Sequence, residues 1–528
     1  MSTYQFPSKR NVHYAKSAMV ATSTPLAAQA GLDIIKKGGN AIDAAIATAA
    51  MLTVVEPTSN GIGGDAFALI WTSGKLHGIN GSGPAPHRIS AEAIQGAGHE
   101  KMPIFGMIPI TVPGLPATWA ALSERFGKLP LEVVLKPAID AARDGFAVTE
   151  TVAKYWEKAF QKYSEIFKEP VYDEWFKVFA PNGNAPKAGE IWRSEAHAQT
   201  LEELAQTNCR SFYEGRIAAK IAHLSNANGG YIDVSDLRTY KPEWVEPIAC
   251  DYRGYQVCEI PPNGQGISAL MALNMLNQFD LKDYYEPHLL IEATKLAMVD
   301  ANAYVADSNH MTFDYNRMLS SVYAESRAKL IGKQALQPES GQPQSGGTVY
   351  LCTADVEGNM VSYIQSNYMG FGSGVVVPGT GIALHNRGNN FTLEKGHPNC
   401  IAGGKRPFHT IIPGFLMKDG AAIGPFGVMG GFMQPQGHVQ VVTNTIDYHM
   451  NPQSALDAPR WQWMKDKHIT VEPNFPESVI TDLRARGHVV KVDEEIGSFG
   501  RGQIIWRTKE GTYVGGTESR CDGHIASL

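Results

Sequence analysis

The chain has 528 residues, of which 43% are hydrophobic and 19% charged, and its formal net charge is −6. This composition indicates a soluble globular protein and lacks the basic character of a nucleic-acid-binding protein. Six scattered cysteines without a CxxC pair argue against a disulfide framework and against a zinc site.

The N-terminal part predicts two helices followed by a strand hairpin. Apolar residues at helical spacing occupy 27–37 and stop at Gly38, and Asn40 can cap a second helix with Asp43 in its first turn. A glycine turn then leads into the strand "DAFALIW", with "KLHGIN" as its expected neighbour. The second helix is too short to span a bilayer and no secretory signal precedes it. We therefore expect a cytoplasmic protein without a membrane partner.

Strands and helices occur in blocks along the rest of the chain. It is mostly helical as far as His223, followed by strand material at 244–260, a helix at 288–305 and a loose polar region up to Gly347. Hairpins begin at Thr348, and the later expected elements are strands at 411–417, 421–428 and 502–515 and helices at 434–447 and 452–458. Without a regular βαβ rhythm, this order indicates stacked sheets with helices outside them.

Several cofactor and nucleophile motifs are absent. The sequence contains no GxxxxGK[ST], no HExxH and no GxSxG, and "GFGSG" at Gly370 lacks the third glycine of a dinucleotide site. These signatures therefore give no support to a nucleotide, a zinc-protease or an α/β-hydrolase site.

The junction Gly346-Gly347-Thr348 carries the strongest chemical signal. A threonine hydroxyl beside an unhindered glycyl carbonyl can undergo an N→O acyl shift, and Gly347 tolerates a strained backbone. Hydrolysis of the resulting ester would free Thr348 as a new N-terminus. Its α-amine, with a pKa of about 7.7–8.0, could serve as the base for its own hydroxyl. The same three residues are also ordinary at the start of a strand.

A series of short motifs extends this signal over nearly the whole chain. In chain order they are "GGNAIDAAIA", "EPTSNGIGGDAFAL", "VPGLPATWAAL", "PPNGQG", "EATKLAMVDANAYVAD", "GTVYLCTADVEGN", "FGSGVVVPGTGIALHN", "KRPFHTIIP" and "VMGG". Together they resemble the γ-glutamyltransferase family of N-terminal-nucleophile hydrolases. The resemblance implies an α/β (α+β) fold, a four-layer αββα sandwich. It also implies self-cleavage into a large subunit, 1–347, and a small catalytic subunit, 348–528, which stay associated as one domain, as a heterodimer or a higher oligomer.

The resemblance implies the catalytic roles as well. Thr348 would be the nucleophile, and Ser366 falls where the family has a hydroxyl that hydrogen-bonds the catalytic threonine. Gly430 and Gly431 fall on the oxyanion hole, where backbone N–H groups must approach the developing charge. Locally, Ser366 could equally be a polar residue ending a strand, and the glycine pair a simple turn.

The positions that bind the γ-glutamyl group differ from the family. The family holds the α-carboxylate with an arginine and two serines and the α-amine with a carboxylate and an asparagine. The corresponding positions here are Asn80 for the arginine, His409-Thr410 for the serines, Asn390 for the carboxylate and Tyr368 for the asparagine. A neutral amide cannot replace a charge-assisted arginine–carboxylate contact without loss, so a different acyl group is expected.

The leading hypothesis is a self-processing amidohydrolase acting on a small carboxylated amide, with oxamate as the most specific candidate. Arg387, Arg406, His409 and Tyr368 are candidate donors to its carboxylate. A γ-glutamyltransferase or glutathione hydrolase is the first alternative, and a non-catalytic scaffold with the same fold is the second. The mechanism calls for no metal and no organic cofactor, because the amine supplies the base and the backbone supplies the oxyanion site.

Overall fold

Two seven-stranded β-sheets lie face to face in the computed structural model, which describes residues 10–281, 285–338 and 347–528. The first sheet has the order β19 (His524–Ser527), β2 (Met19–Thr22), β10 (Gly347–Ala354), β11 (Met360–Tyr368), β3 (Asp65–Thr72), β4 (Lys75–Gly81) and β7 (Glu243–Val245). The second sheet has the order β1 (His13–Ala15), β18 (Tyr513–Thr517), β17 (Arg501–Arg507), β13 (Ala421–Met429), β12 (Gly414–Lys418), β9 (Tyr255–Glu259) and β8 (Ile248–Tyr252).

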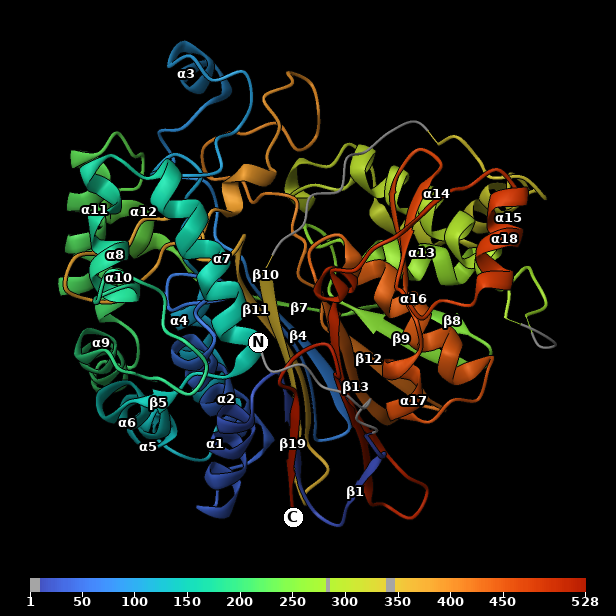
Figure 1. The fold of residues 1–528 in the computed structure, drawn as a ribbon, viewed down its shortest axis with the longest axis horizontal. Coiled ribbons are helices and arrows are strands. Elements are labelled where there is room, and N and C mark those ends of the chain that lie inside the picture. Colours follow the sequence, from blue (N-terminus) through green and yellow to red (C-terminus); the bar gives the residue numbers. More distant parts are fainter. Residues whose placement is uncertain (1–9, 282–284, 339–346) are drawn as a thin grey trace.

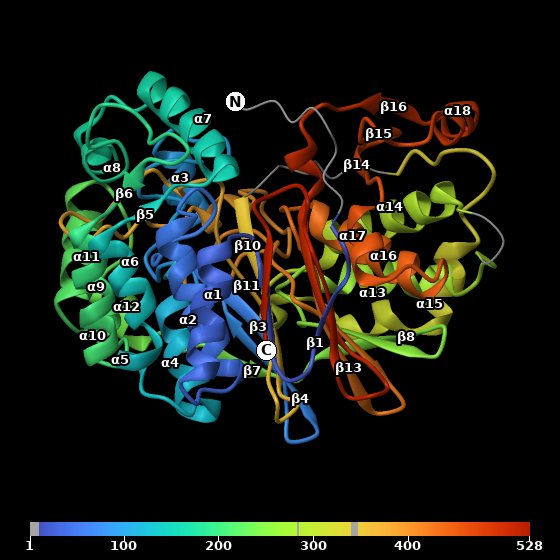
Figure 2. The same ribbon diagram turned by 60° about the horizontal axis from the view of Figure 1, so that its bottom comes forward.

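Helices cover the outer face of each sheet, as Figures 1 and 2 show. The first sheet packs against α1 (Pro25–Lys36), α2 (Ala41–Val55) and α4 (Leu115–Phe126). The second packs against α13 (Gly266–Leu276), α16 (Met433–Ile446) and α17 (Pro452–Asp457), with α14 (Pro287–Tyr304) behind α13 and α16. The layer order is therefore helix, sheet, sheet, helix, which confirms the predicted αββα sandwich.

Shorter elements surround these four layers. The other helices are α3 (Ala91–Gly96), α5 (Leu131–Val134), α6 (Lys136–Asp144), α7 (Glu150–Ile166), α8 (Asp173–Phe179), α9 (Glu195–Gln206), α10 (Ser211–Glu214), α11 (Arg216–Ala227), α12 (Val234–Thr239), α15 (Ser321–Ala328) and α18 (Glu477–Ala485). Short 3₁₀ turns are η1 (Pro170–Tyr172), η2 (Ser308–His310), η3 (Tyr315–Leu319), η4 (Arg387–Asn390) and η5 (Ile496–Phe499). Two small sheets comprise β5 (Phe146–Ala147) with β6 (Ile191–Trp192), and β14 (Trp461–Lys465) with β15 (His468–Val471) and β16 (Val489–Val492).

Strand β10 shows how period-two alternation fills the layers. Val349 and Leu351 belong to the core beneath the helices, whereas Tyr350 and Cys352 belong to the core between the sheets. Because successive side chains of a strand point to opposite faces, Thr348 faces the space between the two sheets. The side chain of Thr348 therefore lies at one end of the core between the two sheets.

Most of the expected elements are present, and their local signals explain them. Asn40 accepts hydrogen bonds from the N–H groups of Ile42 and Asp43, and the Asp43 carboxylate accepts one from the Asn40 N–H, so the predicted cap is confirmed. The expectation of a loose region up to Gly347 is wrong in part, because α15 lies within it, and its residues 339–346, including Gly346, lie outside the described ranges. None of the described helices combines the length and the apolar character needed to cross a bilayer.

Candidate active site

A pair of hydroxyl groups lies at the start of β10 and near the end of β11. Thr348 Oγ1 donates a hydrogen bond to Ser366 Oγ over 3.2 Å. Ser366 Oγ also accepts from the N–H of Tyr368 at 2.6 Å. Both side chains are buried, so these contacts fix the direction of the Thr348 hydroxyl without competition from solvent. The two residues that the sequence places together as nucleophile and partner are therefore in contact.

A buried charge cluster adjoins this hydroxyl pair in the first sheet. Asp65, the first residue of β3, pairs with Ser366 of β11. Its carboxylate accepts hydrogen bonds from Arg387 Nε (3.0 Å), Arg387 Nη2 (3.2 Å) and His409 Nε2 (2.7 Å), and His385 Nδ1 lies 3.4 Å away. All four side chains are fully buried. Two of the predicted substrate donors, Arg387 and His409, thus share one carboxylate that sequence analysis did not identify.

The protonation of this cluster follows from burial and from the arginine. Burial alone would raise the pKa of Asp65, but Arg387, His409 and His385 together hold it well below its ordinary value. Burial, helped by the charge of Arg387, lowers the pKa of His409 to about 4, although Asp65 opposes this shift. At neutral pH the cluster is therefore an ionised Asp65–Arg387 pair with a neutral His409.

This protonation pattern predicts a specific loss of stability in acid. The folded-state pKa of His409 lies below the unfolded value of about 6.5, so only the unfolded chain takes up this proton between about pH 6.5 and 4. Stability should fall as the pH drops through that window, by about 2 kcal/mol between pH 6.5 and 5. We expect the His409→Gln variant to lose correspondingly less stability over this pH range. The measurement is urea unfolding at pH 7 and 5 in an uncleaved background.

A matched control for this measurement is His87→Gln, because His87 is an exposed histidine that also contacts an aspartate, Asp236, at 2.7 Å. This variant should follow the wild-type pH dependence. Equal pH dependence in the His409→Gln variant and the wild type would contradict a buried neutral His409.

Tyr368 and Thr410 complete the surroundings of Arg387. The guanidinium lies 4.6 Å from the centre of the Tyr368 ring, and Arg387 Nη1 donates to Thr410 Oγ1 at 2.8 Å. Tyr368 has a φ of +73°, an unfavourable backbone conformation for a bulky residue, and it pairs with Gly347 across the strands. Burial raises the pKa of Tyr368 to about 12, so its phenol stays neutral. The Arg387 side chain is therefore held from both sides beside the proposed nucleophile.

The glycine pair lies on the opposite sheet. Gly430 (φ +138°) and Gly431 (φ +59°) connect β13 to α16 in conformations that side-chain-bearing residues rarely adopt. The two sheets approach closely here, since a Cβ atom on Gly427 would lie 2.5 Å from the Tyr350 ring. Gln265 Nε2 links the pair to the charge cluster by donating to the carbonyls of Gly431 (2.9 Å) and Thr410 (2.6 Å). A helix N-terminus preceded by such glycines suits a developing negative charge.

A cleft of about 600 Å³ opens beside Gly430. Its walls carry the aromatic rings of Phe105, Tyr155 and Tyr163 together with charged groups that include Arg501. A volume in this range is typical of sites that bury a drug-sized ligand, for which pockets of about 300–1,000 Å³ are usual. The cleft therefore has room for a substrate with a bulky part next to the glycine pair.

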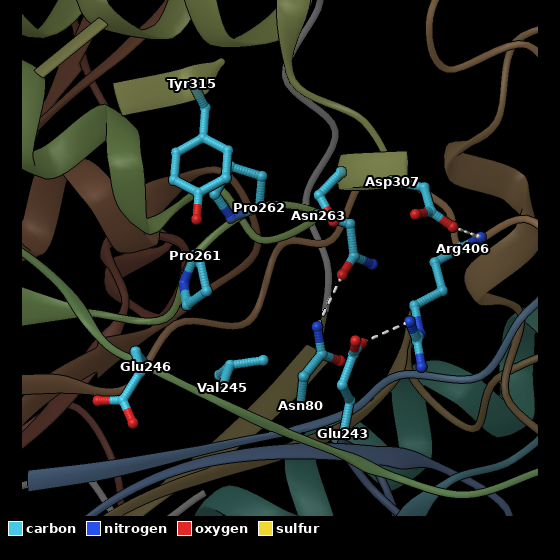
Figure 3. Close-up of a pocket in the computed structure, with 11 residues that line it drawn as sticks. Asn80, Glu243, Val245, Glu246, Pro261, Pro262, Asn263, Asp307, Tyr315 and Arg406 are labelled. Carbon is cyan, nitrogen blue, oxygen red and sulfur yellow. Dashed lines mark hydrogen bonds and ion pairs between the residues drawn. The ribbon is translucent and has the colours of Figure 1, made fainter. Parts of the chain in front are cut away.

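Asn80 and Arg406 lie apart from this cleft, at a second cavity of about 220 Å³ that Figure 3 shows. Asn80 Nδ2 donates to Asn263 Oδ1 at 2.9 Å, and its Oδ1 accepts from the Ser82 hydroxyl at 2.6 Å. Arg406 Nη1 binds Glu243 at 2.7 Å. Both predicted substrate ligands are thus engaged by protein groups at this cavity, and neither lines the cleft beside Gly430.

Asn390 is the predicted substrate residue with the weakest connection to the others. It ends η4, three residues after Arg387, and its carbonyl accepts from Asn399 Nδ2 at 2.7 Å. Its own Nδ2 is buried and finds no acceptor within the described ranges. The amide could donate to a ligand, but it cannot supply the negative charge that a substrate ammonium would need.

One group among the described residues has the geometry of a metal site, namely His288, Glu292 and His488. Lys295 Nζ lies 2.7 Å from Glu292 and 3.5 Å from His488 Nδ1, and His488 Nε2 lies 2.9 Å from His288 Nδ1. An ammonium already neutralises the carboxylate, and the ring nitrogens are engaged with one another. The group is a closed, buried hydrogen-bond chain between α14 and His488, the residue before β16, and it does not suit a cation.

The sequence alone did not identify four residues of this region: Asp65, Asn263, Gln265 and Arg501. A usable signal existed for Asp65, since an acidic residue opening an otherwise apolar strand has to be paired when that strand is buried. Asn263 and Gln265 lie in the quoted motif "PPNGQG", but their partners are distant in sequence. Nothing near Arg501 indicated a site.

Comparison with known proteins decides the family. The γ-glutamyltranspeptidase family model matches residues 27–528. The chain belongs to the γ-glutamyltranspeptidase family. As a member it is an N-terminal-nucleophile hydrolase that acts on C–N bonds, and the predicted resemblance is confirmed.

Relatives of the γ-glutamyltranspeptidase family cover nearly the whole chain. The Glutathione hydrolase-like YwrD proenzyme of Bacillus subtilis is 36% identical over 97% of this chain and 98% of its own length. The Oxamate amidohydrolase proenzyme of Klebsiella pneumoniae is 33% identical over 95% and 96%. The crystal structure of cephalosporin acylase from Bacillus halodurans superimposes with a TM-score of 0.97 at 56% identity, covering 100% of this chain and 99% of that one.

Proposed function

We propose that the protein is a self-processing acylase that hydrolyses an amide through an ester on Thr348. The observation that carries this proposal is the contact between the Thr348 and Ser366 hydroxyls at the strand ends, with the Gly430–Gly431 turn on the facing sheet. In the precursor, Thr348 Oγ1 attacks the carbonyl carbon of Gly347. The peptide bond becomes an ester, and water then releases Thr348 with a free α-amine.

The processed site repeats this chemistry on a substrate. The α-amine accepts the proton of the Thr348 hydroxyl as its oxygen attacks the amide carbonyl, and the N–H groups of Gly430 and Gly431 stabilise the oxyanion. The proton passes to the departing amine, and water hydrolyses the acyl ester to free the acid and Thr348. Water is the second reactant of this cycle, and the α-amine of Thr348 serves as its base.

Cleavage before Thr348 would leave two interlaced fragments. Within the first sheet β2, β3, β4 and β7 come from 1–347, whereas β11, β19 and all of β10 after Gly347 come from 348–528. Within the second, β1, β8 and β9 come from the larger piece and β12, β13, β17 and β18 from the smaller. Neither piece has a complete sheet, so the expected product is a heterodimer that stays together without a covalent link.

The size of the cleft favours an acylase substrate over oxamate. Oxamate is a far smaller molecule than a cleft of about 600 Å³ can hold. The high similarity to a structure described as a cephalosporin acylase supports the same reading. A γ-glutamyl hydrolase is the second candidate, favoured by the names of several relatives. A γ-glutamyl substrate carries an α-amine on its acyl group, and this amine distinguishes the two candidate functions.

A matched pair of substrates tests this distinction. Glutaryl 4-nitroanilide and γ-glutamyl 4-nitroanilide differ only in the α-ammonium, whose usual carboxylate partner is replaced here by neutral Asn390. We expect the glutaryl compound to have the higher kcat/KM, by about ten- to a hundredfold, because a hydrogen bond to a charged group contributes about 1.5–3 kcal/mol. The measurement is nitroaniline release by the processed protein, with ammonia release from oxamate as a third arm.

The opposite order of the two kcat/KM values would support a γ-glutamyl hydrolase. A value for γ-glutamyl 4-nitroanilide above about 10⁴ M⁻¹s⁻¹ and above the glutaryl compound would contradict the acylase proposal. Turnover of oxamate alone would instead support the small-amide hypothesis.

A further inference from the structure

Arg501 lies directly beside the proposed oxyanion site. It is the first residue of β17, and its Cα pairs with that of Met429, the residue before Gly430. Ile505, on the same face of β17, belongs to the core between the sheets, so strand alternation turns Arg501 toward that space as well. Its side chain is 6% exposed and lines the cleft of about 600 Å³.

The guanidinium of Arg501 contacts two side chains, and its Nε has no hydrogen-bond partner among the described residues. Nη1 lies 3.2 Å from Glu56 Oε1, and the group stands 4.7 Å from the centre of the Tyr155 ring. This Nε atom is buried. Burial raises the pKa of Glu56 to about 7, although the charge of Arg501 and the hydrogen bond from Ser23 oppose this shift. Arg501 therefore brings a buried cation to the wall of the cleft.

Of the basic residues that line the cleft, Arg501 is the most buried, and the lining also includes the carboxylates of Asp493 and Glu495. Lys158 pairs with Glu495 and is about half exposed. Lys162 stands 5.4 Å from the centre of the Phe105 ring. Both of these ammonium groups belong to α7, whereas Arg501 projects from the strand next to Gly430. A carboxylate placed against Arg501 would lie near the Gly430 turn, because Arg501 pairs with Met429 across the strands.

We propose that Arg501 is a specificity residue that binds a carboxylate on the amine half of the substrate, the half that leaves when the amide is cut. The candidate acyl-side groups Arg387, His409 and Thr410 are buried and do not line this cleft. The cleft beside Gly430 is thus available to the amine half. This inference rests on the proposed amide hydrolysis and adds the chemical class of the leaving group, an amine bearing an acid close to its nitrogen.

The test uses amines that differ by one carboxylate and needs no turnover. Calorimetry on the processed protein compares 5-amino-2-nitrobenzoate with 4-nitroaniline. We expect the carboxylated amine to bind about ten- to a hundredfold more tightly, the range for one hydrogen bond to a charged group. Arg501→Lys should remove part of this preference, because lysine lacks the planar fork, and the double variant Arg501→Gln with Glu56→Gln should remove all of it without leaving a buried charge unpaired.

Kinetics with the two glutaryl anilides of these amines provide the second readout. The kcat/KM ratio of carboxylated to plain anilide should fall in both Arg501 variants. Arg253→Lys is the matched control, since Arg253 also contacts a carboxylate, Asp447, at 3.2 Å and a ring, Tyr252, at 5.3 Å. Its ratio should equal that of the wild type, and self-cleavage on a denaturing gel reports folding of each variant.

The outcomes separate the two proposals. Equal binding of both amines by the wild type, or a preference that survives in the double variant, overturns the role of Arg501. Binding that depends on Arg501 in a protein that hydrolyses neither anilide overturns the proposed amide hydrolysis and leaves the carboxylate site standing.

Discussion

Replacing Thr348 with alanine should leave the chain whole and inactive. Both reactions proposed for this site use the same oxygen, which contacts Ser366 Oγ at 3.2 Å. Without it there is no N→O shift, no new N-terminus and no ester. Removal of an activated hydroxyl nucleophile in another hydrolase lowers kcat by about 10⁶-fold, and a comparable loss is expected here. A denaturing gel should show one band for the variant and two for the wild type, and the smaller fragment should begin Thr-Val-Tyr.

Two further variants make this result specific to the hydroxyl. Thr348→Ser keeps an oxygen and should still cleave, more slowly, because the β-methyl group that restricts the threonine rotamer is lost. Ser366→Ala keeps the nucleophile but removes the acceptor of its hydrogen bond, so both cleavage and turnover should slow without stopping. Cleavage of the alanine variant at the same bond would rule out Thr348 as the attacking group.

The second large effect is expected at Asp65. Asp65→Asn is nearly isosteric but removes the charge that compensates Arg387 in a fully buried site. Removing one partner of a buried ion pair typically costs about 3–5 kcal/mol, because the remaining charge is left unpaired and away from solvent. We expect a loss of this size in the free energy of unfolding. Urea titration in the Thr348→Ala background measures it on a single uncut chain.

Two comparisons identify the cause of that loss. Adding Arg387→Met to Asp65→Asn should recover much of the stability, since no buried charge is then left unpaired. Glu243→Gln, which breaks the more exposed pair with Arg406, should cost about 1 kcal/mol or less. A loss from Asp65→Asn no larger than that from Glu243→Gln would show that the cluster is less buried or less charged than its geometry indicates.

The sequence by itself determined the elements whose causes are local. The cap at Asn40 and Asp43 lies within four residues, and alternation along β10 can be read from its own side chains. The junction at Gly347 and Thr348 is likewise contiguous, so its chemistry could be stated before any partner was known. The family motifs supplied the layer order and Ser366. The small sheet of β14, β15 and β16 was missed, because short edge elements carry weak periodicity.

Only the tertiary structure decided which charges meet. Asp65 and Arg387 are 322 positions apart, and Glu56 and Arg501 are 445 apart, so no window of sequence contains either pair. Residues that looked equivalent as substrate-binding candidates were separated in the same way: Arg387 and His409 converge on Asp65, while Asn80 and Arg406 line another cavity. Local patterns determine the backbone conformation and the face of an element on which a side chain lies, because both depend on near neighbours in the sequence. The partner of a buried charge depends on which strand, helix and turn ends the fold brings together.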